Sequence, residues 1–239
     1  MGQADIVLLV VISTLAGLAM PAGALLATYK GIQPRWIEKE LRHGILALGA
    51  GALISAVGLV LVPEGVKDVS IPTALLCFVG GALAFMALDI YLAKKKTAGS
   101  QLTAMLTDFV PESIALGATA ALGGGTMLLG ALIAVQNLPE GFNAFREMLP
   151  KNKKRSGKLI GLFAVMALLG PLCSLIGFYY LVHYPVIVSG IMLFAAGGIL
   201  YSVFQDIAPQ IRMENHWLPP LGGILGFLVG LIGYMLEKH

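Results

Sequence analysis

The chain has 239 residues, of which 57% are hydrophobic and only 12% are charged, and its formal net charge is +3. Soluble domains carry about 25% charged residues, so this composition, with a mean hydropathy of +0.85, excludes an ordinary soluble protein. It predicts an all-α, polytopic membrane protein.

Eight apolar segments follow one another along the chain, separated by short stretches that contain proline, glycine, lysine or asparagine. Each is close to the length of about 20 residues that an α-helix needs to cross a bilayer. We therefore predict eight transmembrane helices in a single domain, 1–239. The predicted helices are 5–29, 43–63, 72–93, 103–121, 124–149, 157–182, 186–208 and 217–236. No basic residue precedes the first, so we expect a retained helix rather than a cleaved signal peptide.

The basic residues alternate between the predicted loops. Four lie in 30–42, three in 94–96, six in 146–158 and one at Arg212, and only Lys67 and Lys238 lie on the other side. Because cytoplasmic loops carry the excess of Lys and Arg, we predict that these four loops face the cytoplasm and that both termini are extracytoplasmic. We expect the protein to lie in the plasma (inner) membrane. The lipid bilayer is then its expected partner, and we expect no binding of nucleic acid.

Two Pro-Glu pairs, Pro111-Glu112 and Pro139-Glu140, lie in the fourth and fifth predicted helices. A carboxylate at membrane depth costs about 2.5–3.5 kcal/mol on insertion scales, so a chain that keeps two in one pattern is expected to use them. Each proline also removes a backbone donor, which leaves a carbonyl one turn earlier without its helical partner. Asp108 lies four residues before the first glutamate, so these two carboxylates share a helix face.

The same spacing recurs in the fifth predicted helix, where Gln136 lies four residues before Glu140 and Asn137 is the next residue around the helix. If the two helices face each other, five side chains with oxygen atoms converge near the middle of the membrane. Carboxylates, amides and carbonyls are the ligands of divalent cations. The alternative is a polar helix–helix contact between protonated acids and amides. Asp206, in the seventh predicted helix, is either a ligand at the inner mouth of a path or an interfacial residue.

These residues resemble the ZIP (Zrt/Irt-like) family of divalent metal transporters. The family's fourth and fifth helices typically read His-Asn-x-Pro-Glu-Gly, where this chain has Asp-Phe-Val-Pro-Glu-Ser at 108–113 and Gln-Asn-Leu-Pro-Glu-Gly at 136–141. The stretches 49–65 and 195–210 look similar to its second and seventh helices. The resemblance implies a ZIP-like bundle in which predicted helices 1, 4, 5 and 6 form a transport part. Helices 2, 3, 7 and 8 would form a scaffold part, through which a homodimer is expected.

The departures from the family pattern concern the residues that hold metal. The family usually has histidine at the positions of Asp108 and Gln136, and asparagine at the position of Phe109. Its sixth helix often has a glutamate before a proline, where this chain has Gly170. Family members can hold two adjacent metals, and the residues at positions 109 and 170 argue against the second one here. The site that is left is histidine-poor and built from oxygen ligands.

The resemblance implies a transporter rather than an enzyme, with a divalent metal moving toward the cytoplasm as substrate and no cofactor. The expected metal ligands are Asp108, Glu112, Gln136, Asn137, Glu140 and Asp206. Oxygen ligands favour Mn²⁺, Fe²⁺ or Mg²⁺, whereas Zn²⁺ also binds carboxylates and is the commonest substrate of the family, so zinc is the leading expectation. A degenerate member that senses metal or moves another substrate, and an intramembrane enzyme with an acid dyad, are the alternatives.

Overall fold

The computed structural model describes residues 3–28, 35–95, 98–123, 125–148, 153–211 and 219–238. These residues are helical almost throughout and include no strand, which confirms the all-α prediction. The α-helices are α1 (Gln3–Ala27), α2 (Arg35–Ala56), α3 (Val62–Gly65), α4 (Ile71–Lys95), α5 (Ala98–Ala121), α6 (Thr126–Glu147), α7 (Lys153–Ala167), α8 (Leu169–Tyr179), α9 (Pro185–Ser202), α10 (Ala208–Ile211) and α11 (Pro219–Lys238). Two π-helical segments, η1 (Val57–Leu61) and η3 (Val203–Ile207), and a 3-10 turn, η2 (Leu181–His183), connect some of them.

Six helical stretches in the described part of the chain are long and apolar enough to cross a membrane, which identifies an integral membrane protein. They are Asp5–Ala27, Leu41–Gly65, Ile71–Leu92, Ser156–Tyr179, Pro185–Ile211 and Pro219–Leu236. The other two predicted spans, 103–121 and 124–149, coincide with α5 and α6, whose lengths are 24 and 22 residues. The acids and amides that mark these two helices also lower their hydropathy, so they do not qualify as spans by composition.

The structure corrects several of the predicted helix boundaries. α5 begins at Ala98 rather than at residue 103. α2 begins at Arg35 rather than at residue 43, because the polar stretch before the apolar segment consists mainly of good helix formers. The predicted helix 157–182 is interrupted at Leu168, whose amide bonds the Val165 carbonyl at 3.1 Å. Pro171 has no N–H for the carbonyl of Ala167, four residues earlier, so the helix divides there into α7 and α8.

Prolines also account for the two π-helical segments. In each segment an amide N–H bonds a carbonyl five residues back, as Ala208 does with Val203 at the end of η3. Pro63 follows the last residue of η1 by two positions, and Pro209 follows η3 in the same way. A proline lacks the N–H and crowds the carbonyl four residues earlier, which favours one widened turn ahead of it. Asp206 lies in the widened turn before the second of these prolines.

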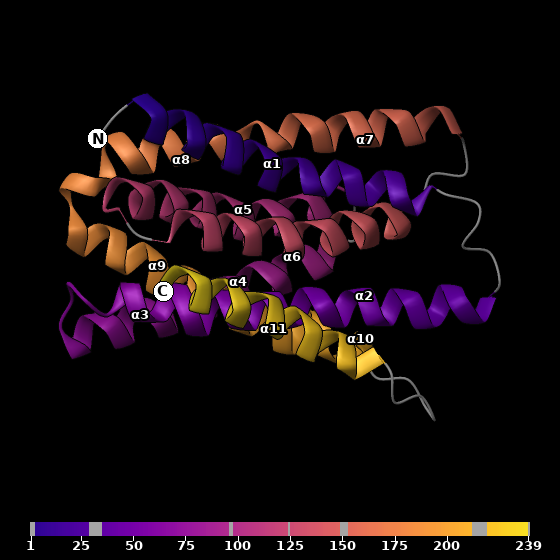
Figure 1. Cartoon of the computed structure of the whole chain (residues 1–239). Coiled ribbons are helices and arrows are strands. Elements are labelled where there is room, and N and C mark those ends of the chain that lie inside the picture. The colour runs from indigo at the N-terminus through magenta and orange to yellow at the C-terminus, as the bar shows by residue number, and fades with distance from the viewer. Residues whose placement is uncertain are drawn as a thin grey trace.

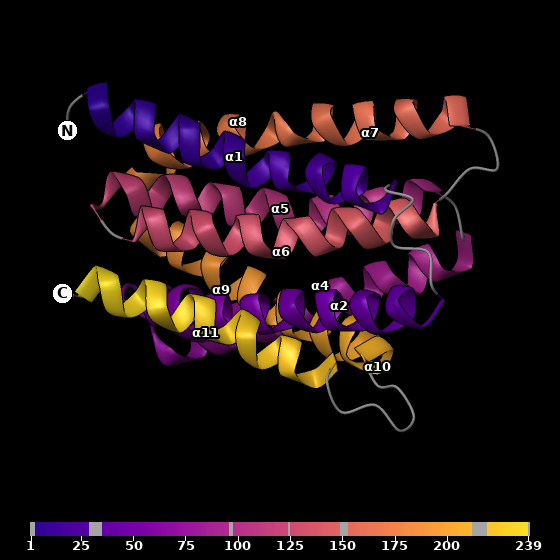
Figure 2. The ribbon, with the colours of Figure 1, turned by 45° about the vertical axis from the view of Figure 1, so that its right-hand side comes forward.

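The helices form two layers (Figures 1 and 2). α1, α5, α6, α7 and α8 form one layer, and α2, α3, α4, α9, α10 and α11 form the other. Within each layer, helices pair through glycines whose Cβ would lie between 1.8 and 2.1 Å from a backbone oxygen of the neighbour, so that only glycine fits. The contacts are Gly141 to Met20 (α6 to α1), Gly117 to Ser174 (α5 to α8), Gly51 to Gly223 (α2 to α11) and Gly81 to Phe194 (α4 to α9). Small residues that let backbones approach are the usual basis of helix pairing in membranes.

Contacts between the two layers are made by side chains. A Cβ on Gly49 of α2 would lie 2.9 Å from the ring of Pro139 on α6, and one on Gly233 of α11 would lie 2.5 Å from a methyl group of Leu128. Side chains yield more easily than backbones, so these two glycine contacts hold the helices less closely than the glycine contacts within the layers do.

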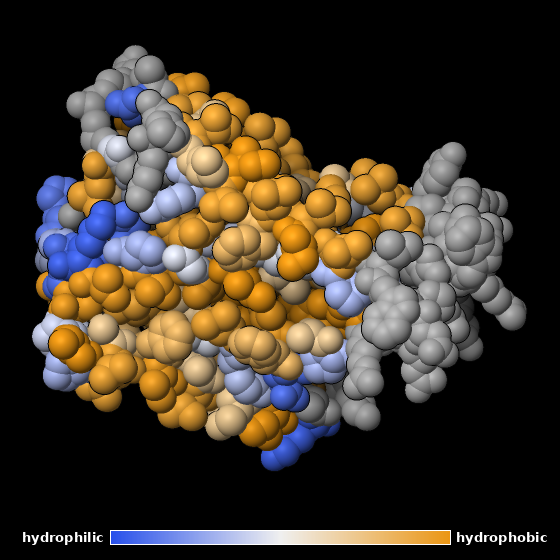
Figure 3. Space-filling model, turned by 60° about the horizontal axis from the view of Figure 1, so that its bottom comes forward, coloured by the Kyte–Doolittle hydropathy of each residue, from blue (hydrophilic) through white to orange (hydrophobic). Residues whose placement is uncertain are grey.

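The outer surface of the bundle is apolar where α4 and α11 lie. Leu76 on α4 is 75% exposed and Leu236 on α11 is 76% exposed. Apolar side chains cover most of the middle of the face drawn in Figure 3. Such a surface is stable against hydrocarbon and not against water, because exposed apolar patches of this extent are rare on soluble monomers.

Candidate cation site between the two layers

α5 and α6 pack against each other in the middle of the bundle (Figures 1 and 2) and carry five of the six predicted site residues. Pro111 and Pro139 lie inside these helices. Phe109, which stands where the resembled family usually has asparagine, is 1% exposed and belongs to the apolar core.

Glu112 and Gln136 face each other across the α5–α6 contact. Each is 1% exposed, and the Gln136 amide nitrogen donates a hydrogen bond to Oε2 of Glu112. The other carboxylate oxygen and the Gln136 amide oxygen are buried and have no hydrogen-bond partner in the described part of the chain. The pair therefore offers two buried acceptor oxygens.

Asn137 links α6 to α1. Its Nδ2 donates to the backbone carbonyl of Ala16 at 2.9 Å, and the side chain is 1% exposed. Its Oδ1 is a third buried acceptor without a hydrogen-bond partner among the described residues. We refer to Glu112, Gln136 and Asn137 as the buried group.

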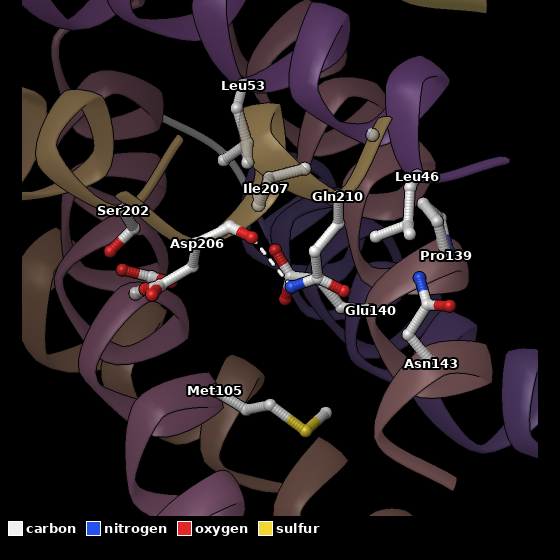
Figure 4. A pocket seen from close by; sticks show the side chains of 12 residues that line it. Leu46, Leu53, Met105, Pro139, Glu140, Asn143, Ser202, Asp206, Ile207 and Gln210 are labelled. Carbon is white, nitrogen blue, oxygen red and sulfur yellow. Dashed lines mark hydrogen bonds between the residues drawn. The ribbon is translucent and has the colours of Figure 1, made fainter. Parts of the chain in front are cut away.

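A cavity of about 130 Å³ lies beside the buried group, between the two layers (Figure 4). About 10–15 Å³ of such space holds one water molecule, so the cavity has room for a cation with part of its hydration shell. Three carboxylates from three elements line it: Asp108 of α5, Glu140 of α6 and Asp206 of η3. We refer to these three as the cavity acids.

Amide groups share the wall with the cavity acids. Gln210 donates from Nε2 to the backbone carbonyl of Asp206 at 2.6 Å, which is the dashed line in Figure 4. Asn143, on α6, accepts a hydrogen bond from Nε of Arg42 on α2 at 3.4 Å. This second bond joins the two layers at the edge of the cavity.

The buried group and the cavity acids form one electrostatic cluster. Asp108 is close enough to Asp206 for their charges to interact, and the charges of Asp108 and Glu112 both act on Glu140. Oδ1 of Asp108 is buried and has no hydrogen-bond partner within the described ranges. Like charges that lie close together disfavour one another, so a cation beside Asp108, Glu112 and Glu140 would be held favourably.

The six predicted ligands thus lie in two neighbouring sets. Asp108, Glu140 and Asp206 line the cavity, whereas Glu112, Gln136 and Asn137 lie behind its wall. No three His, Cys, Asp or Glu side chains among the described residues are close enough to hold a metal ion. A metal bound in this arrangement would need ligands of other kinds beside the carboxylates, or a closer approach of the two sets.

Sequence reasoning missed four residues of the cavity wall that carry polar or sulfur atoms, Met105, Asn143, Ser202 and Gln210. The first lies three positions before Asp108, and the second lies three positions after Glu140. Residues three apart share a helix face, so extending the motifs by one helical turn in each direction would have found both.

No model of a known protein family matches this chain, and no curated protein matches it significantly. The resemblance to the ZIP family therefore stays a prediction, carried by the motifs at 108–113 and 136–141.

Proposed function

We propose that this protein is a ZIP-like transporter that moves a divalent metal cation across the membrane between its two layers. The observation that carries this proposal is a set of buried oxygen atoms that no donor reaches within the described part of the chain. They belong to Asp108, Glu112, Gln136 and Asn137. An unsatisfied buried polar group costs about 1–3 kcal/mol, and more when it is charged. A divalent cation satisfies several such oxygens at once, because its preferred ligands are carboxylate and amide oxygens.

In this proposal α5 and α6 are the fourth and fifth of eight crossings. Their acids and amides are covered by the other helices, so their low hydropathy does not prevent burial in the membrane. The start of α1 and the end of α11 lie at the same end of the bundle in Figures 1 and 2, which fits an even number of crossings. The distribution of lysine and arginine then places that end outside the cytoplasm.

The position of the cavity supports release toward the cytoplasm. Met105 lies in the first third of α5, Asn143 lies in the last turns of α6, and Gln210 lies near the end of α10. All three are next to the predicted cytoplasmic loops. The buried group lies deeper, so a cation would pass from the buried group to the cavity acids on its way in.

The two layers supply the two parts that such a transporter needs. The layer of α1, α5, α6, α7 and α8 carries the buried group and two of the cavity acids, and we assign it the transport role. The other layer carries Asp206 and is assigned the scaffold role. Movement between them is supported by the side-chain character of their contact, because the glycine-to-backbone contacts described above lie inside the layers.

Uptake of divalent metal into proteoliposomes tests this function. The purified protein is reconstituted, and entry of Zn²⁺ is followed with a trapped indicator, with Mn²⁺, Fe²⁺, Cd²⁺ and Mg²⁺ as competitors. The decisive variant combines Glu112→Gln and Glu140→Gln, which removes two charges and keeps the size of both side chains. The matched control is Glu64→Gln, because Glu64 is an acid that pairs with Lys67 at 2.6 Å at the outer end of α3.

We expect the wild type and the Glu64→Gln variant to transport, and the double variant to fall to the rate of protein-free vesicles. Undiminished uptake by the double variant would reject the site. Saturable binding of metal by the wild type without any uptake would support the alternative of a metal sensor. Neither binding nor uptake of any of the five ions would reject metal handling altogether.

A further inference from the structure

Met105 places a sulfur atom in a cavity whose other polar groups are carboxylates, amides and a hydroxyl. It lies on α5 three residues before Asp108, on the same helix face, and is 4% exposed. Its side chain and sulfur are visible in Figure 4 at the wall of the pocket that Glu140 and Asp206 also line. The bundle therefore places a soft donor atom in the wall of the cavity that the hard oxygen ligands also line.

The position of this methionine separates it from the other buried methionines. Met20, Met166 and Met192 are 0%, 5% and 2% exposed, and none of them lines the cavity. For those three, filling irregular space in the core is a sufficient role, and methionine is well suited to it. Met105 packs against the same core, but it also faces the cation site.

Thioether sulfur discriminates between metals. Soft sulfur ligands favour the more polarisable ions such as Zn²⁺ and Cd²⁺, whereas Mg²⁺ and Mn²⁺ prefer carboxylate, carbonyl and water. An all-oxygen site would therefore select the harder ions. A site with one thioether beside two or three carboxylates shifts the preference toward the softer ones.

We propose that Met105 is a specificity-determining ligand, which makes this cavity selective for thiophilic divalent cations over Mn²⁺ and Mg²⁺. The inference rests on the proposed transport function and adds the substrate class and the residue that sets it. A cation held by the carboxylates of Asp108 and Glu140 takes the sulfur as an additional ligand. Sulfur also eases the difficulty that no three His, Cys, Asp or Glu side chains of the described residues come together.

Competitive uptake tests the selectivity. Proteoliposomes are loaded from a mixture of Cd²⁺ and Mn²⁺, and the ratio of the two ions taken up is compared between wild type, Met105→Leu and Met166→Leu. Leucine keeps the apolar volume and removes the sulfur. We expect the Cd²⁺ to Mn²⁺ ratio to fall about tenfold in Met105→Leu, the low end of the loss that follows removal of a group around a metal. The ratio should be unchanged in Met166→Leu.

The metal–sulfur contact can also be detected directly, without a transport assay. The decisive measurement uses protein that keeps Met105, and the Met105→Leu variant serves as a further comparison. X-ray absorption on the Cd²⁺-loaded protein, with Cys77→Ser and Cys173→Ser to remove both thiols, should show cadmium–sulfur scattering. The scattering should persist in Met166→Leu and disappear in Met105→Leu. Oxygen-only scattering from the loaded protein that retains Met105 would overturn the proposal, even if Met105→Leu failed to fold.

The two proposals fail in different ways. A wild type that transports both ions, with a ratio that Met105→Leu leaves unchanged, would refute the role of Met105 and leave transport intact. A wild type that transports neither ion would refute transport, and the selectivity proposal with it.

Discussion

Glu112 and Glu140 each follow a proline directly, in two adjacent helices, and yet their surroundings differ. Glu112 is 1% exposed and accepts a hydrogen bond from Gln136. Glu140 lines a cavity that the two layers share. One motif therefore yields a closed position in one helix and an open position in the other.

The neighbouring helices explain the difference. Gly141, directly after Glu140, lets α6 approach the backbone of α1 closely, and Gly49 of α2 lies against the ring of Pro139. These contacts turn Glu140 toward the boundary between the layers, where the widened turn η3 brings Asp206. A Pro-Glu motif defines which face of a helix is polar, and the partner helices determine whether that face is sealed or open.

The largest effect is expected from breaking the contact that holds α6 on α1. A Cβ at Gly141 would lie 2.1 Å from the Met20 carbonyl oxygen, so Gly141→Ala forces two backbones apart. We expect the free energy of unfolding in mixed micelles to fall by about 3 kcal/mol, the upper end of the usual cost of overpacking. Gly80→Ala on α4 is the control: nothing lies within 4 Å of its Cβ position, and alanine there should be neutral or stabilising by up to about 1 kcal/mol. Equal stability of the two variants would contradict the close approach of α1 and α6.

Removing the hydrogen bond inside the buried group should have the next largest effect. Gln136→Leu leaves Oε2 of Glu112 buried without its donor, which should lower the free energy of unfolding by about 2 kcal/mol. Gln210→Leu, in the cavity wall, is the matched control, because Gln210 is exposed and bonds only a backbone carbonyl of its own helix end. An exposed substitution of this kind should change stability by less than about 0.5 kcal/mol. A larger loss for Gln210→Leu than for Gln136→Leu would reverse the distinction between closed and open positions.

Thiol accessibility measures the same distinction directly. In a background with Cys77→Ser and Cys173→Ser, the Glu140→Cys variant should react with a water-soluble thiol reagent faster than the Glu112→Cys variant, since only position 140 lines the cavity. We expect at least about a tenfold difference in rate, equivalent to about 1.4 kcal/mol of opening free energy. Addition of reagent to one side of oriented vesicles identifies the side to which the cavity opens. Equal rates would show that both glutamates are equally reachable.

The smallest effect is expected at the hydrogen bond between the layers. Arg42 donates to Asn143 across 3.4 Å, near the long end of the hydrogen-bond range. A double-mutant cycle with Arg42→Gln and Asn143→Ala should give a coupling of about 0.5–1 kcal/mol. Arg42 also makes a further interaction. The double-mutant cycle subtracts the effect of that interaction, so that only the coupling between Arg42 and Asn143 remains. A coupling near zero would contradict a hydrogen bond between the layers at this point.

Much of the fold and part of the site follow from the sequence. The apolar segments, together with the turn residues between them, predicted where the helices of the described residues lie, except where Pro171 divides one helix and where α2 and α5 begin early. Helical spacing predicted that Glu112 and Gln136 lie on polar faces of their helices, and these two side chains meet in a hydrogen bond between α5 and α6. The sequence did not predict that the six residues separate into the buried group and the cavity acids. That separation depends on which side chains of the neighbouring helices pack against each motif, and neither motif contains that information.

By itself, the sequence determined that the chain is helical, that it belongs in a membrane and that its costly polar groups cluster in two of its helices, because hydropathy and helical periodicity are local properties. Only the tertiary structure decided that Glu140, Asp206 and Met105 line one cavity. These groups come from distant parts of the chain, and their meeting depends on glycine contacts and proline-widened turns that set how closely whole helices approach. Backbone packing, rather than any motif, therefore set the chemistry of the cavity.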